Sequence, residues 1–151
     1  MLIGFFEIEP NTQKLVLESN LECVGAVESL ISHVRDKYGI KEEYCNDIWV
    51  VLNEAVSNAI RHGNKLNLSK KVCLMVECKN DTYVCFTVKD EGKGFDYKNL
   101  PDPTNPERIG EPDGRGVFLI QKLAHKVNFS KKGSVVEMCF DIRKSQSVPN
   151  K

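Results

Sequence analysis

The stretch Asn53-Glu54-Ala55-Val56-Ser57-Asn58-Ala59-Ile60-Arg61-His62-Gly63 decides how this sequence is interpreted. It ends a predicted helix from about residue 41 to residue 62, whose apolar stripe is Ile48, Val51, Leu52, Ala55 and Ala59. Gly63 predicts the end of that helix. Glu54 and Asn58 are four residues apart, so they share a helix face beside the stripe. A carboxylate and a carboxamide placed in this way suit a proton acceptor and a ligand for Mg²⁺, although the pair alone is also typical of a solvated face.

Two glycine-containing segments follow later in the chain. Asp90-Glu91-Gly92-Lys93-Gly94 comes directly after a predicted strand. Its glycines allow the backbone to approach a planar ligand, and the aspartate can accept a hydrogen bond from an exocyclic amine such as that of adenine. Gly114-Arg115-Gly116 precedes a predicted helix, whose first backbone N–H groups can bind phosphate. Each segment is weak evidence by itself, whereas the three in this order predict a nucleotide site. The sequence has neither a Rossmann fingerprint nor a Walker loop.

The order of periodic segments predicts the fold class. Helical and strand-like segments segregate, which indicates an α+β fold: a two-layer sandwich with one mixed, mostly antiparallel sheet covered on one face by helices. Ser19 and Glu22 form a capping-box pattern before the first helix, which should end near Gly39. We expect a single domain over residues 1–142, a polar tail over 143–151, and a lid or binding loop over the proline-rich stretch 97–113. The predicted strands are 2–8, 14–17, 72–78, 83–89, 127–130 and 134–142.

Composition excludes several classes of function. Lys plus Arg and Asp plus Glu number 21 each, so the zero net charge predicts no direct nucleic-acid partner and no membrane partner. No apolar run approaches the roughly 20 residues of a membrane helix, and no signal-peptide pattern is present, so we expect a cytoplasmic protein. The six cysteines form no C-x-x-C pair, and we expect them to be reduced and structural. Trp49 and Phe118 lie in apolar stripes and are predicted to be core residues.

The three segments together resemble the motifs of the GHKL ATPases. Residues 53–63 resemble their N box, residues 90–95 their G1 box and residues 114–117 their G2 box. The resemblance covers nearly the whole chain. The sequence of the N box is most similar to that of the RsbW-like anti-sigma factor serine/threonine kinases. It implies the Bergerat-type ATP-binding fold, ATP and Mg²⁺ as cofactors, an anti-anti-sigma protein of the STAS type as substrate, a sigma factor as second partner, and a homodimer.

The resemblance also implies residue roles. Glu54 would be the catalytic base, and Asn58 would bind Mg²⁺ and with it the nucleotide. Asp90 would accept a hydrogen bond from the adenine amino group. The remaining positions would hold the nucleotide, namely Gly92, Gly94, Gly114, Arg115, Gly116 and Ser134. Ser134 stands where the family often has threonine, so its hydroxyl is less tightly positioned.

Two other functions share this fold. A histidine kinase would need a dimerisation helix pair with a phospho-accepting histidine, and only His33 lies on the predicted N-terminal helix. A non-catalytic ATP-sensing adaptor would bind a partner without phosphorylating it. Glu54 argues against the adaptor, because a pure binder needs no carboxylate at that place.

Overall fold

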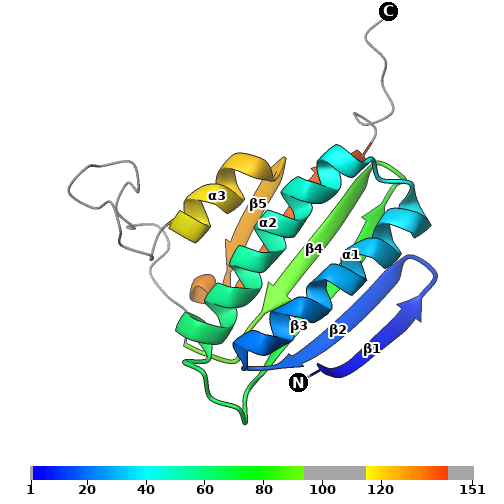
Figure 1. The fold of residues 1–151 in the computed structure, drawn as a ribbon. Helices are drawn as coiled ribbons and strands as arrows, with labels where there is room; N and C mark the ends of the chain where they lie inside the picture. Colours follow the sequence, from blue (N-terminus) through cyan, green and yellow to red (C-terminus); the bar gives the residue numbers. More distant parts are fainter. Residues whose placement is uncertain (1, 94–114, 143–151) are drawn as a thin grey trace, which may run out of the picture.

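The computed structural model describes residues 2–93 and 115–142. The predictions for residues 97–113 and 143–151, and those for Gly94 and Gly114, lie outside the described residues. Six strands form one sheet, and the helices cover one of its faces (Figure 1). The strands are β1 (Leu2–Glu9), β2 (Thr12–Glu18), β3 (Lys71–Lys79), β4 (Tyr83–Lys89), β5 (Lys126–Ser130) and β6 (Val135–Asp141). The helices are α1 (Gly25–Tyr38), α2 (Glu42–Asn58) and α3 (Arg115–Leu123).

The sheet has the strand order β1-β2-β3-β4-β6-β5. Every neighbouring pair in this order is antiparallel, so among the described strands the sheet is antiparallel throughout and not mixed as predicted. Strands β1 to β4 lie in the sheet in their order along the chain. The last two strands are exchanged, so β6 pairs with β4 and β5 lies at the edge. The predicted α+β class and two-layer arrangement are confirmed, including the hairpin at Asn80-Asp81, where both residues have positive φ.

The core lies between the sheet and the helices because alternate strand residues point to the helical layer. This alternation is visible in β3, where Val72, Leu74 and Val76 are buried and the residues between them are not. The helices contribute the apolar stripes expected from the sequence. From α1 these are Val27, Leu30, Ile31 and Val34, and from α2 they are Cys45, Ile48, Val51, Leu52, Ala55 and Val56.

Two helix ends depart from the prediction. The N-cap is Asn20 and not Ser19: the Asn20 side chain accepts from Glu22 N–H and starts a 3-10 turn, Leu21–Val24, before α1. The Ser19 hydroxyl instead donates to Lys70 O, a long-range partner that a local pattern does not reveal. After α2, the chain continues through a π-helical turn, Ala59–Gly63, of the kind often found at functional sites. Gly39 ends α1 in a left-handed conformation, as predicted.

Trp49 and Phe118 are not core residues. Trp49 is 40% exposed and Phe118 is 37% exposed. Each lies one position, about 100° of helix rotation, from a buried neighbour, Ile48 in α2 and Val117 in α3. The prediction was wrong because the number of residues that a helix buries on its apolar face depends on the elements packed beside it, which the sequence pattern does not show.

Cys85 and Cys139 contradict the expectation that all cysteines are reduced. They are direct partners across β4 and β6, with Cα atoms 4.0 Å apart, and they form a disulfide. The other four cysteines are free. Each of the two cysteines lies in an ordinary apolar pattern, so no local pattern indicates the pairing, which arises from strand register.

The disulfide lies on the sheet face that the described helices leave uncovered, yet both cysteines are buried. An ion pair between Lys79 and Glu137, with Nζ and Oε2 2.9 Å apart, joins β3 to β6 diagonally across Cys85. On the other side, the Lys126 ammonium lies 4.4 Å from the centroid of the Tyr83 ring, and this contact crosses β6 beside Cys139. Long side chains therefore cover the disulfide where no helix does.

We expect the disulfide to stabilise the fold. Its partners are 54 residues apart in sequence, and closing such a loop in the unfolded chain stabilises the native state by about 2–4 kcal/mol. Thiol titration of the denatured protein should find four free thiols before reduction and six after it. Urea unfolding should then give a lower midpoint for the reduced protein, and a Cys85→Ala, Cys139→Ala double variant should not respond to reductant. Six thiols in protein that was never reduced would contradict the disulfide.

Candidate functional site

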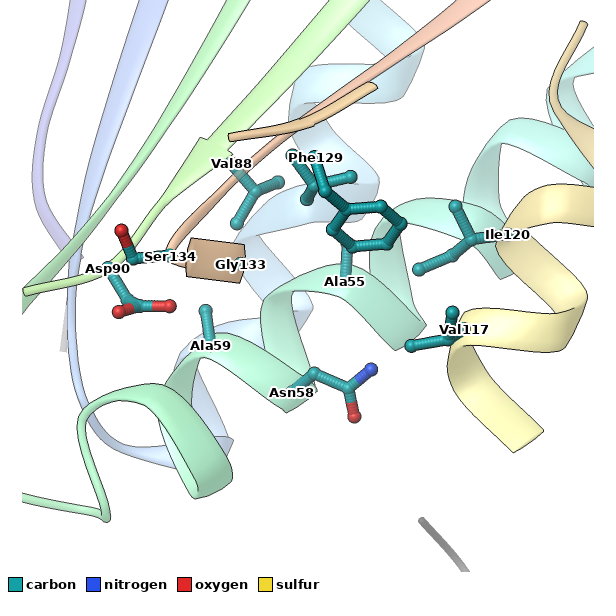
Figure 2. Close-up of a pocket in the computed structure, with 11 residues that line it drawn as sticks. Ala55, Asn58, Ala59, Val88, Asp90, Val117, Ile120, Phe129, Gly133 and Ser134 are labelled. Atoms are coloured by element: carbon teal, nitrogen blue, oxygen red, sulfur yellow. The ribbon is translucent and has the colours of Figure 1, made fainter. Parts of the chain in front are cut away.

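A pocket opens between α2, α3 and the ends of β4 and β6 (Figure 2). It is a shallow hollow with about 300 Å³ of space between its atoms, a volume that includes open solvent. Three polar side chains, those of Asn58, Asp90 and Ser134, face it. Its other walls are apolar or lack a side chain, and they are made by Ala55, Ala59, Val88, Val117, Ile120, Phe129, Gly133 and Val136.

Asp90 is held at the end of β4 by contacts on both sides. Its N–H donates to Ser134 O over 2.9 Å, and its Oδ1 accepts from Gly92 N–H over 2.8 Å. The side chain is only 7% exposed. Burial raises the pKa of the Asp90 carboxyl above its ordinary value, opposed by the Gly92 hydrogen bond and by the charge of Lys70.

Two glycines make room for this carboxylate. A Cβ placed on Gly63, at the end of the π-helical turn, would lie 2.3 Å from Asp90 Oδ2. A Cβ on Gly92 would lie 1.9 Å from Gly63 O. The end of the helix and the loop after β4 are thus in direct contact, and neither position accepts a larger residue. Gly63 was predicted only as a helix end, and its second role is visible only in this contact.

Ser134 lies beside Asp90 at the same end of the pocket (Figure 2). It follows a tight turn in which Lys131, Lys132 and Gly133 all have positive φ. The Ser134 hydroxyl donates to Lys131 O over 2.9 Å, so the turn itself orients it. The oxygen can still accept a hydrogen bond, so it remains able to contact a nucleotide, as the family resemblance implies for a hydroxyl here.

Glu54 and Asn58 come together at the start of α3. A Cβ placed on Gly116 would lie 2.8 Å from both Glu54 Oε1 and Asn58 Nδ2. Both side chains therefore point from α2 toward the first turn of α3, where free N–H groups favour anions. The predicted face of α2 is thus directed at the predicted glycine segment. Arg115 begins α3, but its side chain lies outside the described part of the chain.

These residues fit a magnesium ion by their chemistry. The carboxamide of Asn58 and the carboxylate of Glu54 offer hard oxygen donors, and both side chains are half-buried. Mg²⁺ takes one or two such ligands and completes its shell with phosphates and water. Among the described residues, the group with metal-ligand spacing is Cys85, Glu137 and Cys139 on the opposite sheet face, and two of its members are in the disulfide. Of the two places, the end of the pocket at Glu54 and Asn58 therefore fits a hard cation better.

The apolar walls of the pocket were not predicted as site residues. Ala55 and Ala59 belong to the apolar stripe of α2, where the sequence predicts only core packing. Their small side chains leave a flat surface opposite Val88 and Val136, suitable for a planar ring. Phe129 in β5 closes the pocket from the sheet edge, and no sequence motif marks it.

The buried carboxyl of Asp90 should reduce the stability of the fold at neutral pH. Because its pKa is raised in the folded protein, its contribution to the unfolding free energy is full below the ordinary pKa and is lost as the pH rises through the raised value. Asp90→Asn keeps an acceptor for Gly92 N–H but does not ionise. We expect urea unfolding to show the variant to be more stable than the wild type at pH 7 and equal to it near about pH 3. Asp81→Asn, at an exposed turn, serves as control; a wild type that is more stable than Asp90→Asn at pH 7 would contradict this account.

Comparison with known proteins agrees with the geometry. The family model for the histidine kinase-like ATPase domain matches residues 17–140. Serine-protein kinase RsbW of Oceanobacillus iheyensis is 28% identical over 123 residues, covering 78% of this chain and 77% of that protein. Serine-protein kinase RsbW of Staphylococcus epidermidis is 26% identical over 139 residues, covering 86% of each.

Solved structures show the same fold. The histidine kinase domain of the blue-light activated histidine kinase of Erythrobacter litoralis EL346 superposes with a TM-score of 0.52 at 17% identity, over 83% of this chain and 62% of that one. No helix among the described residues is long and apolar enough to cross a membrane. The chain belongs to the histidine kinase-like ATPase domain family, as the resemblance of its three motifs indicated.

Proposed function

We propose that this chain is an ATP-dependent protein serine/threonine kinase that acts as an anti-sigma factor. Its substrate would be an anti-anti-sigma protein of the STAS type, and its second partner a sigma factor. Supporting this are the family, the relatives named serine-protein kinase RsbW, and above all the meeting of Glu54, Asn58 and Gly116 at one end of the pocket. A homodimer and a cytoplasmic location belong to the same proposal.

The pocket suggests how ATP would lie. Adenine would enter between the small residues of α2 and the apolar wall of β4 and β6, with its amino group donating to Asp90. The phosphates would then extend toward Asn58 and the first turn of α3. Mg²⁺ bound by Asn58 would neutralise phosphate charge there. In this orientation the γ-phosphate would lie near Glu54, as phosphoryl transfer requires.

Glu54 would serve the transfer step. A serine or threonine hydroxyl of the partner attacks the γ-phosphorus, the bond from phosphorus to the β–γ bridging oxygen breaks, and ADP leaves. The hydroxyl proton passes to the Glu54 carboxylate. Much of the rate would come from positioning and charge stabilisation, because the transition state of phosphoryl transfer is loose.

The cytoplasmic location has one observation against it. Cytoplasmic thiols are normally kept reduced, whereas Cys85 and Cys139 form a disulfide. The thiol count described above, carried out on protein alkylated in intact cells, shows whether Cys85 and Cys139 are reduced or form the disulfide in the cell. The ATP that the proposed reaction consumes favours the cytoplasm.

We expect Glu54→Gln to slow phosphoryl transfer while leaving ATP binding largely intact. Removal of a general base usually costs about 10²–10⁴ in rate, and the loss here should lie toward the lower end because the proton leaves late. The assay uses γ-labelled ATP and a cognate anti-anti-sigma protein, and Glu43→Gln, exposed in the first turn of α2, is the matched control.

The stability of the labelled product identifies the class of function. A label on the partner that survives acid is a phosphoserine or phosphothreonine. An acid-labile label on this chain would favour the histidine kinase alternative. Tight ATP binding with no label on any partner would favour the adaptor.

We expect Asn58→Ala to uncouple ATP binding from Mg²⁺. In the wild type, Mg²⁺ should strengthen ATP binding because Asn58 and the phosphates share the ion. Calorimetry with and without Mg²⁺ measures this difference, and Asn46→Ala, exposed on the same helix, should behave like the wild type. The same dependence on Mg²⁺ in Asn58→Ala and wild type would remove Asn58 from the metal site.

A further inference from the structure

Asn64, directly after the π-helical turn, has an unusual set of contacts. Its side chain is only 1% exposed. The amide nitrogen donates to Ser19 Oγ over 2.9 Å and to Lys71 O over 3.0 Å, while Oδ1 accepts from Glu91 N–H over 2.8 Å. One buried carboxamide therefore joins the end of β2, the start of β3 and the loop after β4. Such a fully bonded polar group fixes the segments that it connects.

The contact with Glu91 acts directly on Asp90. Asp90 N–H is held by Ser134 O, and the next peptide N–H, that of Glu91, is held by Asn64 Oδ1. The peptide groups on both sides of the Asp90 Cα are thus fixed, so the direction in which the carboxylate leaves the backbone is fixed too. Of these two bonds, the one from Asn64 is made by a side chain, so substitution can remove it.

Asn64 also connects this loop to α2. Its own N–H donates to Ala59 O over 2.8 Å, which closes the last turn after α2. A second link reinforces the loop, since the Glu91 carboxylate accepts from Lys71 N–H. Asn64 therefore places the Asp90 loop relative to the helix that carries Glu54 and Asn58.

The chemistry of the position calls for asparagine. It needs one acceptor and two donated hydrogen bonds within a buried space, which a carboxamide supplies. An aspartate would lack the donors and would bring a charge, and an alanine would leave Glu91 N–H and Lys71 O without this partner.

We propose that Asn64 is the positioning residue that aims the Asp90 carboxylate at the 6-amino group of a bound adenine, and so sets the preference for an amino-bearing purine. This inference rests on the proposed ATP site. Asn64 itself does not touch the nucleotide; it acts through Asp90.

The test compares two nucleotides that differ only in this amino group. ATP and purine riboside 5′-triphosphate, which lacks the 6-amino group, are titrated against the full chain with Mg²⁺, and the ratio of their dissociation constants is measured. The wild type should bind ATP at least about tenfold more tightly than purine riboside 5′-triphosphate, as expected for a hydrogen bond to a charged acceptor. Asp90→Ala should bring the ratio close to one.

Asn64→Ala should lower this preference by at least about threefold, mainly by weakening ATP binding. A merely structural role would weaken both nucleotides equally and leave the ratio unchanged, which would overturn the inference. Asn67→Ala is the matched control, because Asn67 lies in the same loop and bonds only locally to Ser69 in the contacts described for its side chain. It should keep the wild-type ratio.

Three further outcomes are separated by the design. If Asn64→Ala does not fold, Ser19→Ala decides: it removes one partner of the Asn64 amide, and we expect a smaller loss of preference, whereas an unchanged ratio overturns the inference. If Asp90→Ala collapses the preference while the Asn64 and Ser19 variants keep it, Asn64 is not the positioning residue and the ATP site stands. If Asp90→Ala itself keeps the preference, the assignment of Asp90 in the proposed function fails as well.

Discussion

The close contact between the end of α2 and the loop after β4 is the constraint on which the site depends. Asp90 packs where a side chain on Gly63 would be, and Gly92 packs against the backbone of Gly63. At this contact no side chain of Gly63 or Gly92 intervenes between the helical segment after α2 and the loop after β4. This fixes the two ends of the pocket relative to each other, because neither element can shift without a steric clash.

The pocket places opposite electrostatic requirements at its two ends. At the Asp90 end, a carboxyl is kept nearly dry, and burial raises its pKa. This arrangement costs stability, but a desolvated acceptor makes a stronger hydrogen bond with a ligand. At the other end, half-buried Glu54 and Asn58 face the start of α3, where phosphate and a hard cation are favoured. In the proposed function, these two environments together would orient a nucleotide along the pocket.

The two faces of the sheet have different roles. The helical face holds the core and the pocket, whereas the other carries the Cys85–Cys139 disulfide beneath the Lys79–Glu137 ion pair. β4 and β6 are the strands that the disulfide joins, and they are also the strands whose ends supply Asp90 and Ser134. The covalent link and the Asp90–Ser134 hydrogen bond therefore hold the same pair of strands at two points.

Patterns in the sequence predicted the two-layer fold, the order of most elements and the polar residues of the pocket. Hydrophobic period, glycine position and the spacing of Glu54 and Asn58 are local properties, whereas Ser134 was identified from the family resemblance. The exposure of Trp49, the disulfide, the apolar walls of the pocket and the contacts of Asn64 became visible only in the folded chain. Each of these depends on which distant residues meet. Cys85 meets Cys139 through strand register, and Asn64 contacts Ser19 and Glu91, which are 45 and 27 residues away in sequence. A pattern within one segment carries no information about such partners, because the same asparagine is equally suited to an exposed turn.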